Sequence, residues 1–372
     1  MIYADNAATT RIDPDALEIM QKYLADEYGN ASSLYSFARE GKKVLAEARS
    51  TIAECIGAAP DEIYFTSGGS ESDSWAIKGT ALYGGTKKCV ITSQIEHHAV
   101  LRACEQLEYL GYPVAYLQPE RDGKILPETL ETMIDSSVLV SVMLANNEIG
   151  TIEPIRQLAD IAHLYGAYFH TDAVQAVGHI LVDVKDLGVD LLSASAHKFG
   201  GPKGVGFLYI RKGTKLLPLI NGGAQENGIR GGTENIAGIA AMAAAIENSV
   251  TSMKQTSQKL NLLTQRFYSL LDSAGAEYVV NGNTSDRLPG HISVSFPGKH
   301  GEALLHQLDL KGICVSTGSA CDSTRTEISH VLNAIQLPEH IAEGTLRITL
   351  GKDNTLEDVI YIAETLLKAL KK

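Results

Sequence analysis

Short apolar segments alternate with longer amphipathic ones along much of the chain. Six of the short segments are rich in β-branched and aromatic residues: EIYFTSG (62–68), KCVITSQ (88–94), VLVSVMLA (138–145), AYFHTDAV (167–174), DLLSASA (190–196) and GVGFLYI (204–210). Short apolar runs separated by helix-length segments are typical of a mainly parallel sheet that is covered by helices on both faces. The pattern therefore predicts an α/β fold for this part of the chain.

The hydrophobic pattern changes beyond residue 250. The segment SVTSMKQTSQKLNLLTQRFYSLL (249–271) predicts a long helix with a polar face. GHISVSFPG (290–298) and TLRITLG (345–351) alternate between apolar and polar residues, as half-buried strands do. TLED (355–358) is a capping-box pattern, which predicts the start of the last helix.

We expect two domains from this change of pattern, because a chain of 372 residues is long for a single core. The large domain is predicted over residues 14–250. Its first helix should begin at Asp13 and Pro14, a capping residue followed by proline. Residues 1–13 and 251–372 should form a smaller α+β domain.

Composition excludes several classes of protein. The net charge of −12 argues against direct nucleic-acid binding, since phosphate recognition needs a basic face. Five cysteines without a CxxC spacing predict neither a disulfide framework nor a metal site. The apolar run IAGIAAMAAAI (236–246) is too short to span a bilayer, and the acidic residue in MIYADNAATT does not suit an export signal. We therefore expect a reduced, cytoplasmic protein that does not contact membranes.

Polar and glycine residues follow five of the six predicted strands. In a parallel sheet the carboxyl ends of the strands lie along one edge, where ligands bind. The sequence therefore predicts a binding site formed by Ser67–Ser72, Gln94–His98, Asn146–Glu148, Asp172–Gln175 and Ser195–Lys198.

Two of these groups have both an ordinary and a chemical interpretation. TSGGSESDSWAIKG follows a strand and opens a helix, so Gly69 and Ser70 could hold a phosphate at a helix N-terminus, or form an ordinary glycine turn. Asp172 could cap a helix, or hold a protonated ring nitrogen as an ionised carboxylate.

The remaining groups are a histidine pair and a lysine among glycines. One histidine of EHHAV can face the site, although a histidine at a strand end is more often a satisfied core residue. Lys198 ends an apolar strand, and glycines follow it and leave room around its amine. A reactive lysine, a carboxylate, a flat imidazole and a phosphate site together are what pyridoxal 5'-phosphate requires.

These motifs closely resemble the cysteine desulfurases, the NifS/IscS-like branch of the class-V aminotransferase-type pyridoxal phosphate enzymes. The resemblance covers essentially the whole chain, through DNAATT, FTSGGSES, EHHAV, NNEIG, HTDAVQ, SAHKFGGPKGVG, RGGTEN, GSACDS and LRITLG. It implies the aspartate aminotransferase-like fold, known as fold type I. It also implies a homodimer.

The resemblance implies a role for each matching residue. Lys198 would carry the cofactor covalently, Asp172 would bind its ring nitrogen, and Gln175 would bind its phenolic oxygen. His97 would stack on the ring and take part in catalysis. The phosphate would be held by Gly69, Ser70, Ser195, His197 and, from the second subunit, Thr233. Asn147 and Arg347 would complete the site by binding the substrate carboxylate, Arg347 through its planar fork.

Cys321 matches the family's sulfur-accepting cysteine. It lies in STGSACDSTRTEIS (316–329), a run of small and polar residues that predicts a loop able to move. Asp322 beside it disfavours the thiolate, and Arg325 could offset that effect. Cys314 lies in a predicted strand, and Cys55, Cys89 and Cys104 lie in apolar patterns, so these four are expected to be structural.

The resemblance thus implies conversion of L-cysteine to L-alanine, with the sulfur passing to Cys321 and then to an acceptor protein such as an iron–sulfur scaffold or a thiolation protein. Three alternatives share much of the sequence pattern. They are a selenocysteine lyase, a transaminase of the same fold, and a catalytically silent assembly partner.

Overall fold

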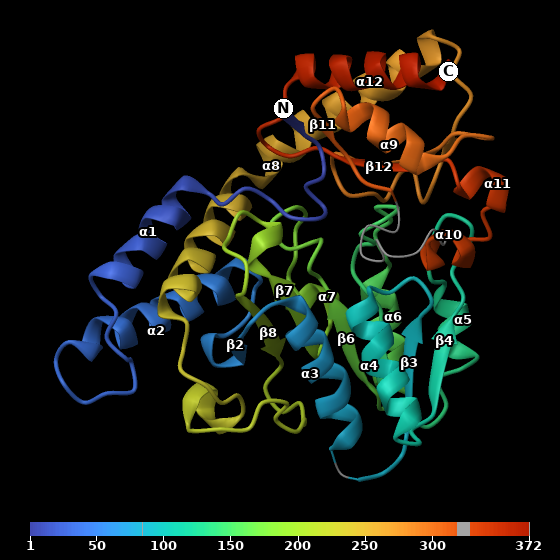
Figure 1. The fold of residues 1–372 in the computed structure, drawn as a ribbon. Coiled ribbons are helices and arrows are strands. Elements are labelled where there is room, and N and C mark those ends of the chain that lie inside the picture. Colours follow the sequence, from blue (N-terminus) through green and yellow to red (C-terminus); the bar gives the residue numbers. More distant parts are fainter. Residues whose placement is uncertain (84, 318–327, 372) are drawn as a thin grey trace.

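The computed structural model describes residues 1–83, 85–317 and 328–371. Its large sheet has seven strands in the order β2-β8-β7-β6-β5-β3-β4. Figure 1 shows this sheet between helices, with a second, smaller α/β layer above it. The strands are β2 (Ile63–Thr66), β3 (Cys89–Ser93), β4 (Val114–Leu117), β5 (Ser137–Ser141), β6 (Tyr168–Asp172), β7 (Leu191–Ser195) and β8 (Gly206–Ile210).

Most neighbouring strands of the large sheet are parallel, as the sequence predicts. The pairs β4–β3, β3–β5, β5–β6 and β6–β7 are parallel, while β8 is antiparallel to both β7 and β2. The six predicted segments all form strands, and β4 is an additional one. The mainly parallel α/β architecture is therefore confirmed.

Successive residues of the central strands enter different cores because side chains alternate across a sheet. Leu139 of β5 and Leu191 of β7 pack in one core with Trp75 of α3 (Gly69–Leu82). Their neighbours Val140 and Leu192 pack in a second, larger core on the other face. Both faces are thus covered, which explains why these strands are apolar throughout.

Helices of the chain cover both faces and connect the strands. Those before the long helix are α1 (Pro14–Ala25), α2 (Ala38–Cys55), α3 (Gly69–Leu82), α4 (His98–Tyr109), α5 (Pro127–Glu131), α6 (Ile155–Leu164) and α7 (Val184–Leu187), with short 3-10 turns at Pro60–Glu62, Ala196–Lys198 and Gln225–Gly228. The start of α1 is as predicted, because the Asp13 side chain accepts a hydrogen bond from the Asp15 amide.

The smaller sheet is antiparallel and has the order β12-β10-β9. Its strands are β9 (Val279–Val280), β10 (His291–Ser295) and β12 (Thr345–Thr349). The helices of this part are α9 (Gly301–Asp309), α10 (His330–Ala334), α11 (Glu339–Ala342) and α12 (Leu356–Leu370). The predicted capping box is present, since Thr355 and Asp358 exchange hydrogen bonds at the start of α12.

The long helix α8 (Ile236–Ser273) contributes to the cores of both sheets. Nine of its first eleven residues pack in the large core, and Leu260, Phe267 and Leu271 pack with the small sheet. Among the described residues it is the one helix long and apolar enough to cross a membrane. However, 56% of its most apolar 18-residue stretch is buried within the protein. Such burial is what a core helix shows.

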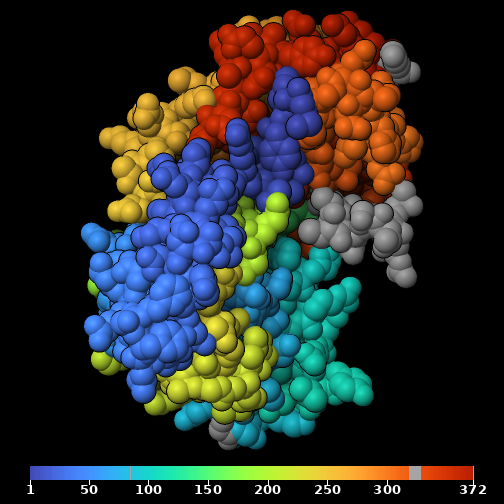
Figure 2. Space-filling view, turned by 60° about the vertical axis from the view of Figure 1, so that its left-hand side comes forward, coloured from blue at the N-terminus to red at the C-terminus, as the bar shows by residue number. Residues whose placement is uncertain are grey.

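The N-terminal segment connects the two sheets. Strand β1 (Ile2–Tyr3) pairs with β11 (Ile313–Cys314) beside the small sheet. A few residues later, the Thr10 amide donates to the His197 carbonyl of the large sheet. Figure 2 shows these first residues in dark blue, lying between the orange and red C-terminal part and the rest of the molecule.

Candidate active site

The ends of β2, β6 and β7 meet, as the sequence predicts for strands of one sheet. Strand β2 leads through Gly68, whose φ of 144° suits glycine, into the N-terminus of α3. A Cβ atom on Gly68 would lie 3.4 Å from the Ser195 hydroxyl, and one on Gly69 would lie 2.7 Å from Val174 Cγ2. Glycine is thus required at residue 69 because the loop after β6 lies against it. The two glycines thus let the ends of β6 and β7 approach the positive end of α3 closely.

Asp172 lies at the end of β6 and is almost fully buried, with 4% of its surface exposed. Its Oδ1 accepts a hydrogen bond from the Val174 amide at 2.9 Å, and its Oδ2 has no hydrogen-bond partner among the described residues. Burial raises the pKa of Asp172 to about 6, and the nearby Lys198 ammonium opposes that shift. The carboxyl group is therefore ionised at neutral pH and has one oxygen available for a ligand.

Lys198 follows β7 in a 3-10 turn and points to the N-terminal segment. Its Nζ donates to the Ala8 carbonyl at 3.0 Å and also to the Ala7 carbonyl. Gln175 donates to the same Ala7 carbonyl at 3.0 Å. The structure thus brings Lys198, Gln175 and Asp172 together beneath residues 7 and 8.

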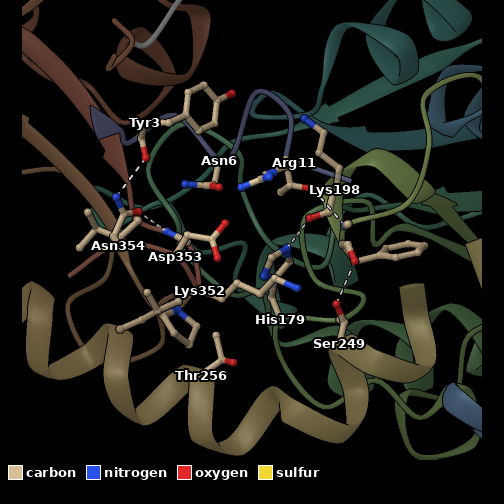
Figure 3. Close-up of a pocket in the computed structure, with 18 of the residues that line it drawn as sticks. Tyr3, Asn6, Arg11, His179, Lys198, Ser249, Thr256, Lys352, Asp353 and Asn354 are labelled. Carbon is tan, nitrogen blue, oxygen red and sulfur yellow. Dashed lines mark hydrogen bonds between the residues drawn. The ribbon is translucent and has the colours of Figure 1, made fainter. Parts of the chain in front are cut away.

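The opposite side of the Lys198 turn borders a cavity of about 550 Å³. Figure 3 shows His179 beside Lys198 in the lining of this cavity, and its Nε2 donates to the Lys198 carbonyl at 2.8 Å. Arg11 and Asn6 from the N-terminal segment and Thr256 from α8 also line the cavity. Lys198 lines the cavity as well, whereas Asp172, Gln175 and Arg347 do not, so the cavity adjoins the predicted site at Lys198 without containing its other residues.

His97 caps the N-terminus of α4. Its Nδ1 accepts a hydrogen bond from the Ala99 amide at 3.1 Å, which leaves the proton of the neutral ring on Nε2. Burial and the neighbouring Lys198 charge lower the pKa of His97 to about 4. The ring is therefore uncharged at neutral pH, as a stacking imidazole should be.

The predicted phosphate ligands are only partly brought together. His197 lies beside Thr9, with 3.1 Å between Nδ1 and the hydroxyl oxygen, and burial lowers its pKa to about 4. Ser70 lies in the first turn of α3 with an exposed side chain. Thr233 is exposed before α8, and within the described ranges it forms no hydrogen bond with the other predicted site residues.

Arg347 lies in β12 and connects the small sheet to the site. Its Nη2 donates to Asp5 at 2.9 Å and its Nη1 donates to the Asn147 carbonyl at 3.1 Å. Only 3% of Arg347 is exposed, and its Nε is buried with no hydrogen-bond partner among the described residues. Asn147 contacts Arg347 through its backbone carbonyl, and their joint binding of one carboxylate stays a prediction.

Cys321, Asp322 and Arg325 lie outside the described residues, so their predicted roles remain predictions. The described residues on either side border the site. The Ser316 backbone pairs with that of Arg347, while Ser329 donates to Glu148 and His330 donates to the Glu96 carbonyl at 2.9 Å.

The four described cysteines lie in structural positions. Cys104 is buried, while Cys55, Cys89 and Cys314 are partly buried. Burial raises the pKa of Cys55 to about 11 and that of Cys104 to about 12, and it also raises the pKa of Cys89. These three thiols are therefore protonated and poor nucleophiles at neutral pH. Within the described ranges, no three His, Cys, Asp or Glu side chains form a group that could hold a metal ion.

Sequence reasoning missed the groups behind Asp172. Asp73 of α3 and His170 of β6 are fully buried there, with 3.7 Å between Asp73 Oδ1 and His170 Nε2. A signal was present, because His170 precedes Asp172 by two residues and so shares its face of the strand. Asp73 lies on the apolar side of α3 with Ala76 and Ile77, which are unusual neighbours for a carboxylate.

Comparison with known proteins supports the same interpretation. The class-V aminotransferase family model matches residues 2–362. A cysteine desulfurase IscS of Dictyoglomus turgidum is 50% identical over the whole of this chain and 95% of its own length. One of Clostridium botulinum (strain Hall) is 48% identical over the whole chain and 94% of its own length.

Solved structures extend the similarity to the fold. A NifS-like protein superimposes with a TM-score of 0.93 at 38% identity, covering 100% of this chain and 99% of its own. SspA in complex with cysteine superimposes with a TM-score of 0.85 at 34% identity, covering 95% of this chain and all of its own. The similarity therefore includes both sheets and the segments that form the site.

Proposed function

The chain belongs to the class-V aminotransferase family, and from this premise we propose that it is a pyridoxal phosphate-dependent cysteine desulfurase. It converts L-cysteine to L-alanine and transfers the sulfur to Cys321, which passes it to an acceptor protein. The observation that carries the proposal is that Lys198, Asp172 and Gln175 lie together beside the N-terminal segment. Asp5 of the same segment accepts a hydrogen bond from Arg347.

The residues present fit the cofactor. Gly68, Gly69 and Ser195 lie at the N-terminus of α3, whose free amides suit a phosphate group. The free Asp172 oxygen suits a protonated ring nitrogen. The proposed ligands are Lys198, Asp172, Gln175, His97, Gly69, Ser70, Ser195, His197, Asn147 and, from a second subunit, Thr233. When bound, pyridoxal phosphate accepts the electron pair left on the substrate Cα after proton removal.

The protein's own residues then bind and orient L-cysteine. Its carboxylate would take the place of Asp5 at Arg347, where the Nε–H and Nη2–H groups can meet two oxygens in parallel. The Lys198 amine removes the Cα proton as general base. His97 is neutral in the resting site, and its ring would be positively charged beside Lys198 only while it carries a proton during the reaction.

Sulfur transfer needs a second nucleophile. The Cys321 thiolate attacks the substrate sulfur, so that an S–S bond forms and the Cβ–S bond breaks. The electron pair of that bond stays on Cβ, which takes up a proton as alanine forms. Cys321 is left as a persulfide, whose outer sulfur moves to the acceptor protein.

Three further features belong to this proposal. Thr233 would act in the site of a partner subunit, which makes the protein a homodimer. The acidic charge suits a protein acceptor rather than a nucleic acid, and the chain would work in the cytoplasm. The acceptor is an iron–sulfur scaffold or a thiolation protein.

Replacing Cys321 tests the proposal against its alternatives. Cys321→Ala should bind L-cysteine and change the cofactor absorbance, yet release alanine at least about 100-fold more slowly, because the attacking thiolate is absent. The partly buried Cys314 of β11 gives the matched control, and Cys314→Ala should keep the wild-type rate. Alanine release from L-cysteine would be measured, with L-selenocysteine in parallel.

Each alternative predicts a different result. Undiminished alanine from L-cysteine in Cys321→Ala would exclude the desulfurase mechanism. Full activity with L-selenocysteine alone would favour a selenocysteine lyase. Formation of a keto acid would favour a transaminase, and a wild-type protein without activity would favour an assembly partner.

A further inference from the structure

A fully buried polar cluster lies behind Asp172, away from the N-terminal segment. It is formed by Asp73 of α3, His170 of β6, Ser141 of β5 and Ser193 of β7, each at most 1% exposed. The two serines bind the imidazole from opposite sides, at 2.8 Å from Nδ1 to Ser141 and 3.0 Å from Nε2 to Ser193. Asp73 Oδ1 lies 3.7 Å from Nε2, too far for a hydrogen bond.

His170 is a neutral member of this cluster. It is completely buried, and burial lowers its pKa to about 3. The ring therefore carries no positive charge at neutral pH and cannot balance a charge on Asp73. The close approach of His170 and Asp73 is thus not an ion pair.

The other titratable groups that face Asp73 are carboxyl groups. Asp172 of β6 and Glu96, which follows β3, both raise the pKa of Asp73 in addition to the effect of its complete burial, while a hydrogen bond with Ser193 acts in the opposite direction. The cation of the region, Lys198, interacts with Asp172. A negative charge is therefore favoured on Asp172 and disfavoured on Asp73.

We propose that Asp73 is a positioning residue, which as the uncharged acid keeps the negative charge of the buried pair on Asp172. Asp73 interacts with Ser193, the residue opposite Asp172 in the pairing of β6 with β7, and its Oδ1 is buried with no hydrogen-bond partner among the described residues. Asp73 thereby supports the strand that presents Asp172 without competing with it for a proton. This role rests on the cofactor-binding function proposed for Asp172.

Infrared spectroscopy of the purified holoenzyme locates the proton directly. Labelling aspartate with ¹³C in its side-chain carboxyl group shifts the aspartate bands. These bands can then be distinguished from those of Glu96 and Glu153. At pH 7.5, above the pKa of Asp172, the wild type should show a labelled band of a protonated carboxyl group. That band should be lost in Asp73→Asn and kept in Asp160→Asn, a matched change at an exposed ion pair.

The link to Asp172 gives a second measurement. In Asp172→Asn the band of the protonated Asp73 should disappear at a lower pH than in the wild type. The reason is that removal of a neighbouring negative charge lowers the pKa of Asp73. A wild-type spectrum without the labelled band at pH 7.5, or a band that survives in Asp73→Asn, would overturn the proposal. A titration unchanged by Asp172→Asn would overturn the coupling.

Cofactor binding then separates this role from simple packing. Asp73→Asn keeps the shape of the neutral acid and should bind pyridoxal phosphate within about twofold of the wild type. Asp73→Ala removes the partner of Ser193 and should bind it about tenfold more weakly. If the enzyme has no affinity for pyridoxal phosphate, the proposed function fails, whereas the infrared band still reports on Asp73. Equal binding by the Ala and Asn variants would contradict the positioning role.

Discussion

Lys198 is one of the residues through which the N-terminal segment contacts the end of the large sheet. Its amine contacts the Ala7 and Ala8 carbonyls, while the backbone of the same residue accepts a hydrogen bond from His179. The turn is therefore held from both sides. A lysine held in this way presents its amine in one direction, which is what covalent cofactor attachment requires.

Reduction with borohydride should fix the cofactor to this amine. The purified wild type should be yellow, and reduction followed by peptide mass spectrometry should find the pyridoxyl group on Lys198. Lys198→Ala should give no labelled peptide and lose alanine formation. Lys203→Ala changes an exposed lysine nearby and serves as the control. Labelling of a different lysine in the wild type would contradict the assignment.

At the scale of elements, the start of α3 lies against the loop that follows β6. The contact is close enough for a single methyl group at residue 69 to meet Val174. Helix α3 provides proposed phosphate ligands and the loop provides Gln175, a proposed ligand of the cofactor's phenolic oxygen, so the separation of helix and loop determines the width of the cofactor site.

Gly69→Ala should therefore weaken pyridoxal phosphate binding, by about tenfold, because the new Cβ would lie 2.7 Å from Val174 Cγ2. The double variant Gly69→Ala, Val174→Ala removes Val174 Cγ2, the atom in the steric clash. It should recover most of the affinity for the cofactor. Val174→Ala alone is the control. Equilibrium dialysis of the cofactor would measure all three, and a double variant as weak as Gly69→Ala would show that the clash is not the cause.

The strands were predictable from their composition, but their directions were less so. The antiparallel β8 follows β7 after only ten residues, Ala196 to Val205, too few for a crossover helix. That spacing was a usable signal. Strand β4 was missed because its residues are half-buried at the edge of the sheet, where the apolar pattern is weaker.

Site residues at strand ends were predictable because the sheet topology brings such ends together. The Arg347–Asp5 pair was not, since it joins residues from opposite ends of the chain. Asp73 and His170 were also missed, because a buried polar group is recognised by its neighbours in three dimensions rather than by sequence spacing.

For the whole molecule, buried titratable groups of two kinds determine how stability depends on pH. Burial lowers the pKa of His97 and His197 to about 4 and of His170 and His291 to about 3. These neutral histidines favour the unfolded state as pH falls below about 6.5, because the unfolded chain binds protons that the folded one does not. Burial raises the pKa of Glu96 and Glu153 to about 8. These two acids favour the unfolded state as pH rises toward 8.

Stability should therefore be greatest at mildly acidic pH and fall as pH rises from about 6.5 to 8, because the folded state must then lose protons that the unfolded chain has already lost. Calorimetric melting temperatures across this range would measure the slope. Glu153→Gln should make it shallower, whereas Glu105→Gln, at an exposed ion pair, should leave it unchanged. A melting temperature that rises from pH 6.5 to 8 would contradict this prediction.

The proposed homodimer makes a prediction about two subunits at once. Mixed dimers of Lys198→Ala and Thr233→Ala chains should recover activity, because one of the two sites would receive a wild-type Lys198 and a wild-type Thr233. Each variant alone should be impaired, and activity of the refolded mixture would be compared with that of both parents. If analytical ultracentrifugation shows a monomer that still binds the cofactor fully, the shared site is refuted.

The position of the N-terminal segment also determines when it can fold during protein synthesis. Strand β1 pairs with β11, about 310 residues later in the chain, and Asp5 pairs with Arg347 further on still. At a synthesis rate of about 5–20 residues per second, the first residues would wait roughly 15–60 s for these partners. The residues that hold Lys198 are thus among the first to leave the ribosome and among the last to find their place. The large sheet can assemble during translation, but the enzyme cannot become active until its final strands have been made.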